Sequence, residues 1–161
     1  MLAKLLHRFL VMASIRKIVV AHDFSEPAGR ALDIALDLAS RFGASVTVVY
    51  AYELGLPPVP FGMDPIPELD ERNARAGRAA LDEMVSRTKA GGFSAIEGVL
   101  REGVPWTEID ALAEEIHADL IVMGTHGRRG LTHAWLGSTA EKVVRTAPCP
   151  VLTVRAQAHA S

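Results

Sequence analysis

Residues 18–52, IVVAHDFSEPAGRALDIALDLASRFGASVTVVYAY, decide the fold of this chain. The stretch begins and ends with apolar runs rich in valine, at 18–21 and 46–52, which are typical of buried parallel strands. Between the runs, Ser25 suits a helix N-cap, Pro27 suits a first helical turn, and Gly43 suits a helix end. Small and apolar residues recur at helical spacing between these signals: Ala28, Ala31, Leu32, Ala35, Leu38, Ala39 and Phe42. The stretch therefore predicts a complete β-α-β unit.

The rest of the chain continues the alternation of strands and helices. Further strands are expected at 94–101, near an edge, and at 120–123 and 151–154. Further helices are expected at 68–90, 105–116 and 138–146, while five prolines predict a long loop at 53–67. In the last helix the residues expected to face inward are Ala140, Val143, Val144 and Ala147. This pattern predicts an α/β fold, a doubly wound five-stranded parallel sheet with helices on both faces, Rossmann-like.

Composition limits the functions that this fold could serve. With 161 residues the chain suits one domain, expected at 15–156, with an N-terminal extension at 1–14 and a tail at 157–161. The extension reads as a start-site artefact or as a short amphipathic arm. A formal net charge of −2 argues against a nucleic-acid partner, and no apolar run is long enough for a membrane span. The one cysteine, Cys149, favours a cytoplasmic protein without disulfides.

A glycine-rich segment follows the expected fourth strand. Gly124, Gly127 and Gly130 would tolerate positive φ angles and leave backbone amides open to an anion. Gly137, Ser138 and Thr139 then open the last helix, whose unpaired N–H groups also favour an anion. Two arginines, Arg128 and Arg129, could reach a terminal phosphate. The segment indicates a phosphate cradle, with a plain surface connection as the alternative.

A second loop, at 21–25, follows the first strand and should end at the same edge of the sheet. Ligands of open α/β sheets bind beyond the carboxyl ends of strands, where neighbouring connections turn to opposite sides. If the first and fourth strands are neighbours, Asp23 lies near the glycine-rich segment. A carboxylate there would repel phosphate but could accept hydrogen bonds from a ribose or an amine.

Spacing adds a resemblance to these arguments. The pattern Gly124-x2-Gly127-x9-Gly137-Ser138 resembles the nucleotide-binding signature of the universal stress protein family. Residues 15–25, IRKIVVAHDFS, resemble the family's first strand and Asp-x-Ser turn, and residues 119–154 resemble its closing strand, loop, helix and strand. The resemblance spans about 15–155.

This resemblance implies a strand order of 3-2-1-4-5, a bound adenine nucleotide (ATP, or ADP or AMP) and a homodimer formed through Val151–Val154. By the resemblance, His22, Asp23 and their neighbours would line the adenosine, and phosphates would lie on the glycine-rich segment. The implied ligand residues are Ala21, His22, Asp23, Ala51, Met123, Gly124, Gly127, Arg128, Gly137, Ser138 and Thr139. Some relatives carry threonine where this chain has Ala140, which removes one hydroxyl from the phosphate end.

Catalysis is less well supported by the sequence than binding. A dimeric regulatory nucleotide-binding protein is favoured; the alternatives are a slow ATPase or phosphotransferase at the same site and a dimer that binds no nucleotide. No carboxylate stands in the glycine-rich segment to activate water, although Asp23 could hold Mg²⁺ or Mn²⁺ bridging the phosphates. His126 and His133 lack the spacing of a metal site. The first turn also lacks the P-loop and dinucleotide-binding patterns.

Overall fold

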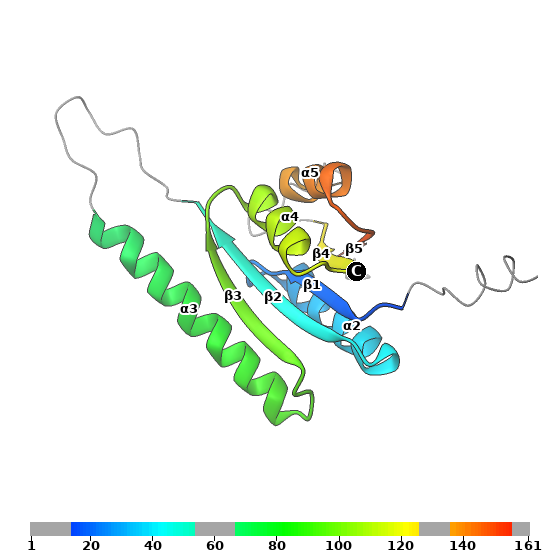
Figure 1. The fold of residues 1–161 in the computed structure, drawn as a ribbon. Helices are drawn as coiled ribbons and strands as arrows, with labels where there is room; N and C mark the ends of the chain where they lie inside the picture. The colour runs from blue at the N-terminus through cyan, green and yellow to red at the C-terminus, as the bar shows by residue number, and fades with distance from the viewer. Residues whose placement is uncertain (1–13, 54–66, 126–135, 156–161) are drawn as a thin grey trace, which may run out of the picture.

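The computed structural model describes residues 14–53, 67–125 and 136–155. Within them, strands and helices alternate along the chain (Figure 1). The elements are β1 (Lys17–Ala21), α2 (Glu26–Phe42), β2 (Ser45–Tyr52), α3 (Pro67–Ala90), β3 (Ile96–Glu102), α4 (Pro105–Glu115), β4 (Leu120–Gly124), α5 (Ser138–Thr146) and β5 (Val151–Val154). Each predicted strand and helix is confirmed, with ends that shift by a residue or two.

The five strands form one parallel sheet in the order β3-β2-β1-β4-β5. The predicted doubly wound fold and the strand order implied by the resemblance are therefore confirmed. β1 is the central strand and pairs with β2 on one side and β4 on the other. Because the connection that leaves β1 and the one that leaves β4 turn to opposite faces, the carboxyl ends of these two strands form the switch point of the sheet.

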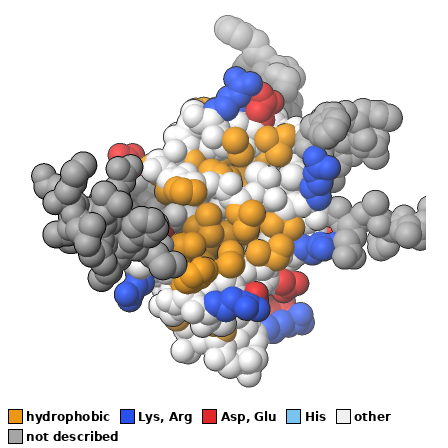
Figure 2. Space-filling view, turned by 90° about the vertical axis from the view of Figure 1, so that its right-hand side faces the viewer, with side chains coloured by type: hydrophobic (Ala, Val, Ile, Leu, Met, Phe, Trp, Pro, Cys, Tyr) orange, Lys and Arg blue, Asp and Glu red, His pale blue; other side chains and the backbone are white. Residues whose placement is uncertain are grey.

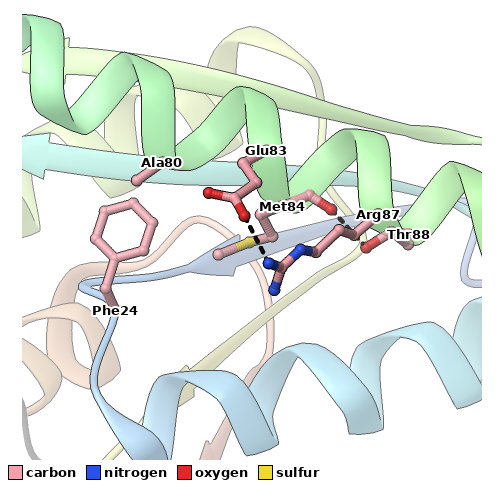
Figure 3. Close-up of a pocket in the computed structure, with 6 residues that line it drawn as sticks. All are labelled: Phe24, Ala80, Glu83, Met84, Arg87 and Thr88. Atoms are coloured by element: carbon pink, nitrogen blue, oxygen red, sulfur yellow. Dashed lines mark hydrogen bonds and ion pairs between the residues drawn. The ribbon is translucent and has the colours of Figure 1, made fainter.

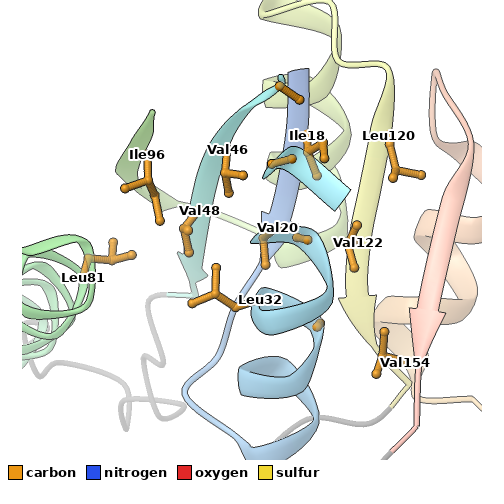
Figure 4. Packing of buried hydrophobic residues seen from close by; sticks show 14 residues of the cluster. Ile18, Val20, Leu32, Val46, Val48, Leu81, Ile96, Leu120, Val122 and Val154 are labelled. Carbon is orange, nitrogen blue, oxygen red and sulfur yellow. The ribbon is translucent and has the colours of Figure 1, made fainter. Parts of the chain in front are cut away.

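Helices cover both faces of the sheet, and a hydrophobic cluster lies under each pair. On one face, α2 and α3 pack over a cluster that includes Val20, Val48 and Leu81 (Figure 4). On the other face, α4 and α5 pack over Val19, Val49 and Ile121. Successive residues of β1 alternate between the two clusters, as a strand buried on both faces requires.

Local signals set the ends of α2 as the sequence predicts. The Ser25 side chain accepts a hydrogen bond from the Ala28 amide, and Gly43 ends the helix in the left-handed conformation with φ 67°. α5 differs in part from the prediction. Its Ala140 and Val143 are buried, but Val144 is 49% exposed, so the expectation that it faces inward is wrong. The helix has only nine residues, and its inward stripe is too narrow to include Val144.

The amino edge of the sheet is fixed by Asp119, which precedes β4. Its Oδ2 accepts hydrogen bonds from the backbone amides of Arg16 and Lys17, at 2.8 and 3.0 Å. The Lys17 ammonium donates to the Ile116 carbonyl at 2.8 Å. These contacts tie the start of β1 to the connection between α4 and β4, at the edge opposite the switch point.

Candidate functional site

Three of the predicted ligand residues lie on adjacent strands at the carboxyl edge of the sheet. Ala21 ends β1 and is the cross-strand partner of Met123 on β4. Ala21 also pairs with Val49 on β2, two residues before Ala51. Because side chains alternate along a strand, Ala21, Met123 and Ala51 all point to the face that α4 and α5 cover. Residues 21 and 51 are alanines, so only methyl groups project from β1 and β2 at these two positions.

The turn after β1 carries His22 and Asp23. The His22 amide continues the sheet by donating to the Val49 carbonyl at 2.9 Å, and the residue is only 7% exposed. The Asp23 carboxylate lies against Ser25, two residues further along the chain. Its Oδ1 accepts hydrogen bonds from the Ser25 amide at 3.1 Å and the Ser25 hydroxyl at 2.5 Å. Ser25 therefore does two tasks, as the cap of α2 and as the donor that orients Asp23.

Gly124 ends β4 directly against the first turn of α2. A β-carbon on Gly124 would lie 2.9 Å from the Pro27 Cβ and 3.2 Å from the Ala28 nitrogen. Positive φ is not the reason for glycine here, because the described glycines with positive φ are Gly43, Gly92 and Gly103. The tolerance of positive φ that glycine offers is not used at Gly124, whose hydrogen permits close packing against α2 instead.

Thr125 joins three elements at the same edge. Its amide donates to the Val154 carbonyl of β5 at 2.8 Å, and its own carbonyl accepts from the Gly137 amide at 2.7 Å. The residue is 3% exposed. Thr125 was not among the predicted ligand residues, and no sequence pattern marks it, because its partners are distant in the chain. It sets where α5 begins relative to β4.

The start of α5 has backbone amides that no described side chain caps. Gly137 is the N-cap, with φ −68° and ψ 154°, and no described side chain caps the helix. Ser138 is exposed and Thr139 is partly buried. An uncapped helix start with two hydroxyls offers hydrogen-bond donors and a positive dipole end to an anion. The predicted anion site at this helix therefore has suitable local geometry.

The described residues thus gather two groups at one edge: Ala21, His22, Asp23 and Ala51 on one side, and Met123, Gly124, Gly137, Ser138 and Thr139 on the other. The remaining predictions fall outside the described residues. Those are Gly127, Arg128, Arg129, Gly130, His126 and His133. Among the residues that are described, no group of three or more His, Cys, Asp or Glu side chains could hold a metal ion.

A groove of about 380 Å³ lies on the other face of the sheet, beside the turn after β1 (Figure 3). It is lined by Phe24, Ala80, Glu83, Met84, Arg87 and Thr88. None of these is a predicted ligand residue. Phe24 nevertheless directly follows Asp23 in the chain, so one residue of the turn after β1 also lines the groove.

Two partly buried titratable groups, the Asp110 carboxyl and the Cys149 thiol, lie away from this edge. Burial raises the pKa of Asp110, although a hydrogen bond from Thr146 partly offsets the effect. Burial, with Asp119 and Asp110 nearby, raises the pKa of the Cys149 thiol. A thiol held protonated is a poor nucleophile, and Cys149 packs against the hydrophobic cluster under α4 and α5. Trp106 likewise packs in the α4 and α5 cluster, with the Lys142 ammonium 5.2 Å from its ring centre.

Comparison with known proteins identifies the family of this chain. The model of the universal stress protein family matches residues 14–155. The chain belongs to the universal stress protein family. A curated relative, a universal stress protein of Methanocaldococcus jannaschii, is 38% identical over 144 residues, which cover 87% of this chain and 82% of the relative.

Two solved universal stress proteins carry adenine nucleotides. One, in complex with cAMP, is 29% identical with a TM-score of 0.65, and the match covers 88% of this chain and 97% of that structure's chain. The other, from Archaeoglobus fulgidus in complex with dAMP, is 27% identical with a TM-score of 0.60, covering 88% and 98%. Among the described residues of this universal stress protein, no helix is long and apolar enough to cross a bilayer.

Proposed function

We propose that this universal stress protein binds an adenine nucleotide at the carboxyl edge of β1 and β4 and acts as a dimeric regulatory protein in the cytoplasm. One observation carries the proposal: the Asp23 turn and the start of α5, which no described side chain caps, lie at the same edge, joined through Ala21, Met123 and Thr125. The cAMP and dAMP complexes of relatives support an adenine nucleotide as the ligand. ATP is the form that the family signature favours, with ADP and AMP at the same site.

The proposed ligand has a direction. Adenosine lies toward Asp23, His22, Ala21 and Ala51, because a carboxylate accepts hydrogen bonds from hydroxyls and amines. Phosphates lie toward the start of α5, where amides and the helix dipole favour negative charge. Met123 and Gly124 lie between the two ends. Gly127 and Arg128 complete the proposed phosphate contacts.

A metal ion enters the proposal only through Asp23. Mg²⁺ or Mn²⁺ prefers oxygen ligands, and a carboxylate with phosphates would supply them. Asp23 Oδ1 already accepts two hydrogen bonds from Ser25, which orients the carboxylate without a metal. If a metal bridges Asp23 to phosphates, Asp23→Asn should abolish the effect of Mn²⁺ on ATP affinity.

We further propose that two copies pair through β5. β5 is an edge strand, and exposed apolar side chains lie on the elements around it: Val144 on α5, Leu152 on β5 and Ile34 on α2. Figure 2 views this side of the molecule and shows hydrophobic side chains gathered on it, with arginines and lysines at the rim. A paired edge strand would cover both the open backbone groups and the apolar side chains.

Calorimetric titration with ATP, ADP and AMP tests the proposed site. Gly137→Val should abolish binding while the protein stays folded, because φ −68° and ψ 154° suit any residue and the new side chain would cover the helix amides. Gly29→Val on α2 is the matched control, since a β-carbon there meets nothing within 4 Å. Equal affinity of Gly137→Val and wild type would refute the phosphate site. Phosphate release above background from bound ATP would favour the slow ATPase instead.

A further inference from the structure

Phe24, between Asp23 and Ser25, has an unfavourable backbone conformation. Its φ is 63°, and among the described residues only His117 is another non-glycine residue with positive φ. In this left-handed region the β-carbon crowds the following carbonyl, so a bulky residue adopts it only where its surroundings hold it. Such strain is often found at binding sites.

Three contacts with two neighbours, His22 and Tyr50, hold Phe24 in this conformation. The Phe24 amide donates to His22 Nδ1 at 3.0 Å. Its ring meets the His22 ring edge-on at 5.2 Å between centres and the Tyr50 ring edge-on at 4.9 Å. Aromatic rings favour this edge-to-face arrangement. The side chain therefore anchors the turn to β2.

Tyr50 is itself held firmly by α3. A β-carbon on Gly77 would lie 2.6 Å from the Tyr50 ring, so the helix backbone packs directly on this ring. Figure 3 shows the Phe24 side chain directed toward α3, near Ala80 and Met84. The ring thus points away from the face where Ala21 and Met123 lie, and its anchor is separate from the proposed ligand residues.

The turn at Phe24 decides where the Asp23 carboxylate lies. Because the chain reverses at Phe24, the amide and hydroxyl of Ser25 return to Asp23 Oδ1, at 3.1 and 2.5 Å. The Ser25 hydroxyl also accepts from the Ala28 amide, which ties the same turn to α2. A change of conformation at Phe24 would break the alignment of Ser25 with Asp23.

We propose that Phe24 is a positioning residue for the nucleotide site: its ring, held by His22, Tyr50 and α3, keeps the strained turn that presents the Asp23 carboxylate to the adenosine. The proposal rests on the proposed function for its ligand. It assigns no contact between Phe24 and the nucleotide. Its effect on affinity must therefore pass through Asp23.

A double-mutant cycle tests this with AMP as the titrant, using wild type, Phe24→Ala, Asp23→Asn and the double variant. Loss of a hydrogen bond to a charged group corresponds to about tenfold or more in affinity. Phe24→Ala should weaken AMP binding by about the same factor as Asp23→Asn, and the double variant should bind no more weakly than Asp23→Asn alone. Additive losses, or unchanged affinity of Phe24→Ala, would overturn the proposal. Phe24→Tyr, which keeps the ring, should retain wild-type affinity.

Hydrogen exchange at the Ser25 amide gives a second test that needs no ligand. This amide should lose protection in Phe24→Ala, while amides in the centre of β1 keep theirs. Phe42→Ala is the matched control, because Phe42 is 47% exposed at the end of α2. If wild type binds no adenine nucleotide, the proposed function fails, and the exchange result still decides whether Phe24 holds the turn. Unchanged Ser25 protection in Phe24→Ala would refute that role.

Discussion

Gly124 on β4 and Pro27 on α2 are packed so closely that a β-carbon on the glycine would lie 2.9 Å from the Pro27 Cβ. The Pro27 carbonyl carbon would lie 3.1 Å away. Backbone atoms at this distance cannot rotate aside as the end of a long side chain can. The contact therefore fixes the distance between the end of β4 and the first turn of α2.

Gly124→Ala should destabilise the protein by about 1–3 kcal/mol, the usual cost of overpacking a tight contact. Urea unfolding followed by circular dichroism measures this. Gly29→Ala is the control, because Gly29 lies in α2 with nothing within 4 Å of the added carbon. It should stabilise the protein by about 0.5–1 kcal/mol, since alanine favours a helix. Equal stability of the two variants would show that the Pro27 contact is not tight.

Val104→Ser should stabilise the protein by about 0.5–2 kcal/mol. Val104 is the N-cap of α4, its conformation is extended, and no described side chain caps this helix. The valine is 44% exposed, so little burial is lost. A serine hydroxyl can accept a hydrogen bond from the first turn. Val104→Ala has no such acceptor and is the control. Thermal unfolding compares the two variants, and a serine variant no more stable than the alanine variant would contradict the prediction.

The paired substitution Val144→Lys and Leu152→Lys should convert the proposed dimer to a monomer. Both side chains are exposed beside the β5 edge, at 49% and 37%, so the change should leave the fold intact. Ammonium groups facing each other in a paired interface would repel and lose hydration. Sedimentation velocity gives the oligomeric state. Val104→Lys is the control, because Val104 follows β3, the edge strand opposite β5, and this variant should remain a dimer. If the variant with both lysines at 144 and 152 still dimerises, this interface is excluded.

Asp110→Asn should change how stability depends on pH. Burial raises the pKa of Asp110 in the folded protein, so its ionised form costs stability at neutral pH, and the cost disappears as pH falls through the raised pKa toward the ordinary value. The asparagine variant lacks this titration. Its stability relative to wild type should therefore fall as pH is lowered through the raised pKa of Asp110 toward the ordinary value.

Denaturant unfolding at a series of pH values measures this difference. Asp33→Asn on the exposed surface of α2 removes the same charge without the burial and is the control. A relative stability of Asp110→Asn that stays flat with pH, or rises as pH falls, would contradict a raised pKa at Asp110.

The elements of this fold follow from local signals that the sequence carries plainly. Ser25, Pro27 and Gly43 bound α2 as predicted, because capping and helix ends depend on neighbours within a few residues. Short apolar runs predict the buried strands for the same reason. The order 3-2-1-4-5 came with the family resemblance, since pairing between distant strands leaves no local mark.

The candidate site was predicted less completely, for physical reasons. The sequence predicts that Gly124 tolerates positive φ, but not that it packs on Pro27, because Pro27 is distant in sequence. Thr125 was missed because its hydrogen bonds go to Val154 and Gly137. The residues around Phe24 in the sequence do not predict its left-handed backbone conformation, because the contacts that hold it come from β2 and α3.

The two ends of the described domain lie at opposite edges of the sheet, which decides where a label can be attached. The backbone enters β1 beside Asp119, at the amino edge of the sheet, and leaves β5 at Val154, whose carbonyl accepts from Thr125 at the carboxyl edge. A dye, bead or affinity handle joined ahead of residue 14 would be attached across the sheet from Asp23 and Gly137. The same handle joined after Arg155 would be attached beside them. Immobilisation for binding measurements should therefore use the amino end.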